Sequence, residues 1–178
     1  DVPVGETGTL LIKGESIAAG YWNQHKLTRE TFLGEWINTK DKFYADADGY
    51  YWYAGRTDDM FKVSGMMVWP TDIEGVLQHH PAVLESGVIG VPDEDGLTKV
   101  RAYVVLKDHH QPSQELVREL QLFVKTNTMP HKYPRSVIFV NELPKTATGK
   151  IQRYKLREIA ARNDRPVSGG ELQLELGS

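Results

Sequence analysis

The sequence predicts an α+β protein with two parts. Residues 1–56 contain short stretches that are rich in aromatic residues and punctuated by glycine, which is typical of strands from part of a small barrel or sandwich. From residue 59 onward, helix-like and strand-like stretches are mixed over roughly 105 residues, which indicates a compact domain with a short mixed sheet and about three helices. The two patterns meet at a short polar junction.

The first part is expected to be mostly strands. Residues 8–13 (GTLLIK) form a short apolar run that predicts a strand, and residues 17–21 are expected to continue it. Residues 26–32 favour a short helix and residues 36–43 a further strand. The turn residues Asp-Ala-Asp-Gly at 46–49 precede four aromatic residues, which predicts a hairpin. Because roughly 55 residues are few for an independent core, this part is expected to belong to a larger domain.

The second part is expected to alternate between strands and helices. It opens with a short strand at 60–63, followed by a turn at Ser64-Gly65. Thr71 is expected to cap a helix that Pro81 ends. The remaining expected elements are strands at 83–91, 100–106 and 137–140 and helices at 113–126 and 154–161. Residues from 163 onward carry proline and glycine and little core-forming sequence, so a loose tail is expected.

The composition excludes several classes of function. A net charge of -3 argues against a protein that coats nucleic acid or an anionic membrane, and no apolar run reaches membrane-spanning length. The absence of cysteine excludes disulfides, thiolate catalysis and cysteine-ligated zinc, and it favours a reducing compartment. The adjacent histidine pairs at 79–80 and 109–110 have no carboxylate at metal-ligand spacing, so no bound metal is expected.

A basic loop near the end of the sequence is the first candidate for chemistry. The stretch LPKTATGKIQR at 143–153 is rich in turn-forming residues and carries Lys145 and Lys150. It is not a phosphate-binding P-loop, because it lacks the glycine that this motif needs five residues before its Gly-Lys, and Ile151 stands where the motif needs serine or threonine. A solvated basic loop is the alternative interpretation.

The junction between the two parts is the second candidate. It reads GRTDDMFKVSG at 55–65. Arg56 offers a fork of donors suited to ribose or phosphate oxygens. Asp58 and Asp59 are ordinary linker residues when considered alone, and Ser64-Gly65 either lets the backbone approach a ligand closely or forms a simple turn.

Taken together, these stretches resemble the C-terminal part of the adenylate-forming superfamily, which includes acyl- and aryl-CoA ligases, carrier-loading adenylation domains and luciferases. The resemblance covers residues 5–162 and is closest to benzoate-type CoA ligases. The segments that carry it, in family order, are GTLLIKGESIAAGYW, WINTKD, GRTDDMFKVSG and LPKTATGKIQR, together with DEDGLTKVRAYVVLK. It implies that residues 1–57 end a large adenylation domain, that residues 58–162 are a small mobile domain, and that residues 163–178 are a tail.

The resemblance also implies roles for individual residues. Asp41 matches the carboxylate that holds the ribose hydroxyls of ATP, and Arg56 matches the arginine at the ribose and phosphate. Asp58 matches the hinge about which the small domain rotates. Ser64 and Gly65 match the loop that lines the pantetheine tunnel after that rotation. Lys150 matches the catalytic lysine of the adenylation half-reaction, which offsets the charge that develops when a carboxylate attacks the α-phosphate.

The segment 131–135 is the expected site for the CoA nucleotide. It mixes ring faces with cations, which suits an adenine and its phosphates. A basic loop that enters a strand is the alternative. The residues concerned are His131, Lys132, Tyr133 and Arg135.

One residue departs from the family pattern. The family usually has Thr-Gly-Asp where this sequence has Thr39-Lys40-Asp41. Lysine in place of glycine requires either a different backbone angle or a cation beside the nucleotide, so the role of Asp41 depends on how Lys40 is accommodated.

By resemblance, the sequence belongs to a cytoplasmic, ATP-dependent aryl-carboxylate CoA ligase that uses ATP, Mg²⁺, CoA and a small aromatic carboxylate. The phosphate-gripping loop and the acid pocket lie in an N-terminal adenylation domain that these 178 residues lack, so the chain alone is expected to be inactive. Two alternatives remain: an adenylation domain that loads a carrier protein, and a non-catalytic nucleotide-binding module of the same fold. The basic, aromatic segment 131–135 favours free CoA over the first.

Overall fold

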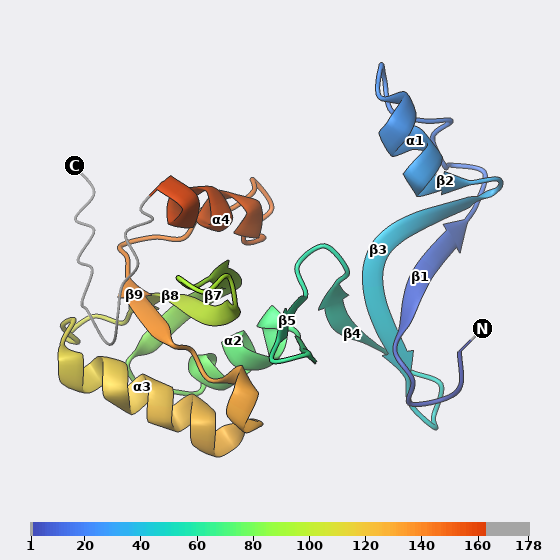
Figure 1. Ribbon diagram of the computed structural model, residues 1–178. Coiled ribbons are helices and arrows are strands. Elements are labelled where there is room, and N and C mark those ends of the chain that lie inside the picture. Colours follow the sequence, from blue (N-terminus) through green and yellow to red (C-terminus); the bar gives the residue numbers. More distant parts are fainter. Residues whose placement is uncertain (1, 163–178) are drawn as a thin grey trace. The chain divides into compact units, whose positions relative to one another are not determined.

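The computed structural model describes residues 2–162, and the expected tail at 163–178 lies outside them. The chain divides into two compact units, the first ending at Asp58 and the second beginning at Asp59. Figure 1 shows the elements of each unit.

The first unit is a four-stranded antiparallel sheet with one short helix. Its central strand β3 (Trp36–Ala45) is long and curved (Figure 1). Strand β1 (Gly8–Lys13) pairs along one edge of β3, while β2 (Phe32–Leu33) and β4 (Tyr51–Arg56) share the other edge. Helix α1 (His25–Thr31) directly precedes β2. Among residues 2–58 the strands form an open sheet and not a closed barrel.

The expected hairpin at 46–49 is confirmed, and its turn is organised by one carboxylate. The side chain of Asp46 accepts hydrogen bonds from the indole N–H of Trp52 at 2.7 Å and from the backbone N–H groups of Tyr50 and Asp48. The indole bond is the largest of the effects that hold the pKa of Asp46 below its usual value, and the backbone N–H donors act in the same direction. The expected extension of β1 through 17–21 is wrong, because that stretch is irregular and has no strand partner.

The second unit has a three-stranded mixed sheet between helices. Strands β7 (Val83–Pro92) and β8 (Thr98–Leu106) form an antiparallel hairpin, and β9 (Ser136–Phe139) lies parallel to β8. Helix α3 (Gln114–Asn127) and the short helix η1 (Pro130–Lys132) connect β8 to β9. The Ser113 hydroxyl caps α3 by accepting from the Leu116 N–H, at the position where the sequence predicted that a helix starts.

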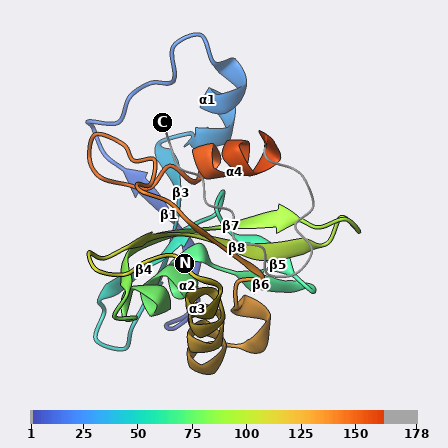
Figure 2. The ribbon, with the colours of Figure 1, turned by 90° about the vertical axis from the view of Figure 1, so that its left-hand side faces the viewer.

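Side chains alternate between two apolar layers, one on each face of this sheet. Val88, Val104 and Val137 pack with helices α2 (Pro70–Gln78) and α3. Their strand neighbours, among them Ile89 and Tyr103, pack against helix α4 (Arg153–Arg162). Figure 2 shows α4 on one side of the strands and α2 and α3 on the other. Within residues 59–162, the mixed sheet and the three α-helices agree with the expected fold.

Helix α2 begins differently from the expectation. The sequence predicted Thr71 as its N-cap, but Trp69 is the cap and Pro70 the first helical residue. Proline fits this position because its fixed φ suits a helix and its missing N–H would have no partner there. A short hairpin precedes α2. It consists of β5 (Phe61–Val63) and β6 (Met66–Val68), of which only β5 was predicted.

Strand β5 is fixed to the sheet by a close approach at Gly90. A Cβ atom on Gly90 would lie 2.6 Å from Cγ of Phe61 and 2.8 Å from Cγ2 of Thr98.

We therefore expect Gly90→Ala to destabilise the chain by about 1–3 kcal/mol in urea unfolding, as overpacking does. Gly75→Ala is the matched control, because a Cβ there meets nothing within 4 Å. It should stabilise α2 by about 0.5–1 kcal/mol, and equal effects of the two substitutions would contradict the packing described.

Candidate functional site

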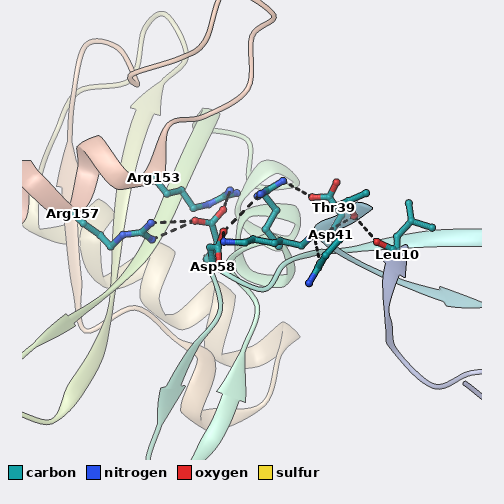
Figure 3. A network of polar contacts seen from close by, with 10 residues as sticks. Leu10, Thr39, Asp41, Asp58, Arg153 and Arg157 are labelled. Carbon is teal, nitrogen blue, oxygen red and sulfur yellow. Dashed lines mark hydrogen bonds and ion pairs between the residues drawn. The ribbon is translucent and has the colours of Figure 1, made fainter. Parts of the chain in front are cut away.

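In the first unit, Asp41 and Arg56 face each other across neighbouring strands. They are register partners in the β3–β4 ladder, and Nη1 of Arg56 donates to Oδ1 of Asp41 at 2.7 Å (Figure 3). The Asp41 side chain is 29% exposed and that of Arg56 41%. One oxygen of the carboxylate is thus engaged by Arg56, while the group still reaches solvent. Asp41 and Arg56, to which the family resemblance gives roles at the nucleotide, therefore lie side by side on neighbouring strands.

Lys40 adopts a backbone conformation that glycine normally occupies. Its φ is +61°, in the left-handed region. The residue belongs to an irregular stretch of β3, where the Thr39 hydroxyl donates to the Leu10 carbonyl and accepts from the Asp41 N–H (Figure 3). The Lys40 N–H donates to Oδ1 of Asn38. The backbone thus keeps the bend that a glycine would allow, with a lysine side chain added.

That side chain pairs with Asp58. Nζ of Lys40 lies 3.5 Å from Oδ2 of Asp58, and Nη2 of Arg56 lies 3.8 Å from the same oxygen. The Asp58 side chain is half exposed, so each contact contributes only about 0–1 kcal/mol of stability. Asp58 is nevertheless flanked by two cations of its own unit.

In the second unit, Lys150 lies on an ordered turn. Lys145 and Ile151 form an antiparallel bridge, the Thr146 N–H donates to the Lys150 carbonyl, and the Lys150 N–H donates to the Thr146 hydroxyl. Gly149 supplies the positive φ of +81° that the turn requires. The expected turn-rich loop is therefore a closed hairpin.

The two lysines of this loop differ in their partners. Nζ of Lys145 is 2.5 Å from Oε2 of Glu85 on β7. Lys150 is exposed and has no ion pair among residues 2–162. Of the two ammonium groups, the one at Lys150 is available to a ligand.

A largely buried arginine, Arg153, follows the loop of Lys150, and it was not among the candidate residues identified from the sequence. Arg153 is the first residue of α4, and its side chain is 12% exposed. It donates through Nε and Nη2 to both oxygens of Glu74 on α2, and through Nη1 to Asp59 at 3.0 Å. Burial alone would lower the pKa of Arg153, but the bonds and negative charges of Glu74 and Asp59 raise that pKa above its usual value. The sequence feature that could have identified Arg153 is its position at the end of the LPKTATGKIQR stretch.

The residues assigned to pantetheine form a tight turn. Ser64 and Gly65 connect β5 to β6 with φ values of +50° and +81°. Two positive φ angles in a two-residue hairpin favour glycine and other residues with small or polar side chains. Both residues are exposed, so their backbone can be approached from solvent.

The residues assigned to the CoA nucleotide are partly engaged with the protein itself. Nζ of Lys132 is 2.5 Å from Oδ2 of Asp72 on α2. The guanidinium of Arg135 lies 4.4 Å from the ring centroid of Tyr133, and Nζ of Lys125 lies 5.7 Å from the same ring. His131 is half-buried. Arg135 is exposed, which makes it the most accessible cation of this segment.

Neither a metal cluster nor a membrane helix is found in the described part of the chain. Residues 2–162 contain no group of three or more His, Cys, Asp or Glu side chains placed to hold a metal ion. Over the same residues, no helix has the length and apolar character needed to cross a bilayer.

The left-handed φ of Lys40 should make the stability of the chain depend on which residue stands at position 40. Lys40→Gly and Lys40→Ala both remove the ion pair with Asp58, but only glycine relieves the left-handed φ. The glycine variant should therefore be more stable than the alanine variant by about 1 kcal/mol in urea unfolding. The same two substitutions at Lys42, which lies in β3 without a positive φ, should give the opposite order. Identical stability of the two Lys40 variants would contradict a left-handed conformation there.

Comparisons with known proteins agree with this organisation. Residues 72–150 match the AMP-binding enzyme C-terminal domain. The chain is 50% identical over 153 residues to a benzoate–CoA ligase of Thauera aromatica, covering 86% of this chain and 29% of that protein. It is 51% identical over 160 residues to a 4-hydroxybenzoate–CoA/benzoate–CoA ligase of Rhodopseudomonas palustris, covering 89% of this chain and 30% of that protein.

A solved structure gives the same result. A benzoate CoA ligase from Burkholderia xenovorans LB400 superimposes with a TM-score of 0.77 at 56% identity, covering 88% of this chain and 31% of that one. The chain thus spans about 30% of the length of the curated relatives that it matches. Residues 72–150 are thus an AMP-binding enzyme C-terminal domain, and most of the chain is similar to part of these benzoate-type CoA ligases.

Proposed function

We propose that the chain is the C-terminal part of an ATP-dependent aryl-carboxylate CoA ligase of the benzoate type. In the first half-reaction, a carboxylate oxygen of the acid attacks the α-phosphorus of ATP, and the bond to pyrophosphate breaks to give acyl-AMP. In the second, the CoA thiol attacks the acyl carbon and releases AMP. The observation that carries this proposal is the 50% identity over 153 residues with a benzoate–CoA ligase.

Lys150 would act in the first half-reaction. Two anions meet when the carboxylate approaches the α-phosphate, and negative charge grows on the phosphate oxygens as the new bond forms. An ammonium group held beside those oxygens stabilises the transition state more than the ground state. The exposed Lys150 side chain, presented by a closed turn and unpaired among residues 2–162, suits this role.

Asp41 and Arg56 would hold the nucleotide. Arg56 engages one oxygen of Asp41, so the second oxygen can accept from a ribose hydroxyl. The remaining donors of the guanidinium can reach a ribose or phosphate oxygen. Mg²⁺ would enter bound to the phosphates of ATP.

Asp58 would be the hinge between the half-reactions. Rotation about it would withdraw Lys150 and bring the Ser64-Gly65 turn to the pantetheine arm of CoA. The segment with His131, Lys132, Tyr133 and Arg135 would meet the CoA nucleotide, with Arg135 as its most accessible cation. Because Lys132 pairs with Asp72, binding of a CoA phosphate by Lys132 would require that pair to open.

The choice of acid would rest on residues outside these 178. The acid-binding pocket is proposed to lie in the adenylation domain, so the chain by itself should not turn over substrate. Identity to benzoate-type relatives supports an aromatic acid.

The role of Lys150 can be tested in the full-length ligase by separating the half-reactions. Lys150→Ala should lower the rate of acyl-adenylate formation, measured as ATP–pyrophosphate exchange, by a factor of about 10²–10³, the usual cost of losing one preorganised contact to the transition state. Formation of the thioester from supplied acyl-adenylate should stay close to the wild-type rate.

Lys155→Ala is the control, because Lys155 is also exposed and without an ion pair among residues 2–162 but lies on α4. It should leave both rates unchanged. Equal loss of both half-reactions in Lys150→Ala would reject the assigned role.

A further inference from the structure

The hydrogen bonds of Arg153 connect three segments that are far apart in the sequence. Its guanidinium bonds both oxygens of Glu74, 79 positions away, and one oxygen of Asp59, 94 positions away. Both carboxylates are as buried as the arginine, at 13% and 14% exposed. Figure 3 shows Arg153 and Arg157 pointing into this network.

Glu74 is itself held rigidly. Its Oε1 accepts from the Val88 N–H at 2.8 Å as well as from Nε of Arg153. Glu74 therefore ties the start of α4 both to α2 and to the central part of β7, which lies in the core of the unit. A bidentate guanidinium–carboxylate pair in a buried place fixes orientation as well as distance.

The start of α4 is in turn fixed to the loop of Lys150. Only two residues separate Arg153 from Lys150. The Gln152 N–H donates to the Pro144 carbonyl, and Ile151 bridges to Lys145, so both strands of the loop are joined at its base. Displacement of Arg153 would therefore be passed directly to the turn that presents Lys150.

The other end of the network lies at the beginning of the unit. Asp59 is the first residue of the second unit, directly after Asp58. It bonds Arg153 and also Arg157, at 3.3 Å from Nη1. The segment that enters the unit is thus fixed to the same helix that follows the Lys150 loop.

We propose that Arg153 is a positioning residue that joins the Lys150 loop to the segment at Asp59, so that both move as one body with α2 and β7. This inference deepens the proposed function, on which the kinetic half of its test rests. Arg153 would not touch the substrate. It would set where the Lys150 ammonium lies, and it would make any rotation at residues 58–59 move the loop by the same angle.

The variant that tests this is Arg153→Lys. It keeps a cation between two buried carboxylates, so the fold should survive, but a lysine cannot span both oxygens of Glu74 and still reach Asp59. Arg157→Lys is the matched control, since it makes the same change on the same helix to a more exposed residue whose contacts are longer and reach only Asp59.

The first readout is amide hydrogen exchange in the chain itself. In Arg153→Lys, the amides of Thr146, Lys150 and Gln152 should exchange about tenfold faster, as expected when a charge-assisted bond that limits local opening is lost. Amides of β8 should be unchanged, and Arg157→Lys should resemble the wild type. Unchanged exchange in the loop, or faster exchange throughout the unit, would overturn the proposal.

The second readout is kinetic and uses the full-length ligase. Arg153→Lys should lower kcat for ATP–pyrophosphate exchange about tenfold or more with little change in KM for ATP, because a displaced cation affects the transition state more than ATP binding. Thioester formation from supplied acyl-adenylate should be spared. Equal loss of both half-reactions would overturn the positioning role.

The two readouts separate this inference from the proposed function. A wild-type ligase without any adenylation activity would refute the proposed function. The amide hydrogen exchange result would then decide by itself whether Arg153 joins the Lys150 loop to Asp59.

Discussion

The polar network of the second unit depends on how charge is balanced at Asp59, which directly follows the more exposed Asp58. Asp58 is flanked by Lys40 and Arg56 of the first unit, and Asp59 bonds Arg153 and Arg157 of the second. A buried carboxylate must be paired to be tolerated, and Asp59 is the more buried of the two. Each of the two carboxylates is thus balanced by cations of its own unit.

Helix α2 is the second organising element. It carries Glu74, which holds Arg153 before α4, and Asp72, which holds Lys132 before β9. Two segments with proposed roles, the Lys150 loop and residues 131–135, are thus each tied to the same helix by an ion pair. The pair at Glu74 is buried and bidentate, whereas the pair at Asp72 is more exposed and thus more readily opened by a ligand phosphate. This difference suits the proposed roles, in which Lys150 would stay in place and residues 131–135 would adapt to a ligand.

The sequence was sufficient for the elements whose local pattern agrees with their packing. The apolar runs of β7 and β8 are buried on both faces, and α3 begins directly after residue 113, where the sequence predicted a helix start. The expected strand at 17–21 was wrong, because a strand forms only where a partner strand is available. This stretch has a β-like sequence but no partner strand. The positive φ of Lys40 was not predictable from lysine itself, although the family pattern raised the question. The Arg153–Glu74 pair arises only when residues 79 positions apart meet in the fold.

AMP release by the full-length protein with ATP, benzoate and CoA is the most direct test of the proposal that the chain is part of an aryl-CoA ligase. Each substrate should be omitted in turn, and pantetheine should replace CoA in one series. AMP release should require all three substrates, and it should fall sharply with pantetheine because the basic segment at 131–135 would contact the CoA nucleotide. Release with other acids but not benzoate would contradict the proposed substrate. No release with any acid would contradict the ligase assignment itself.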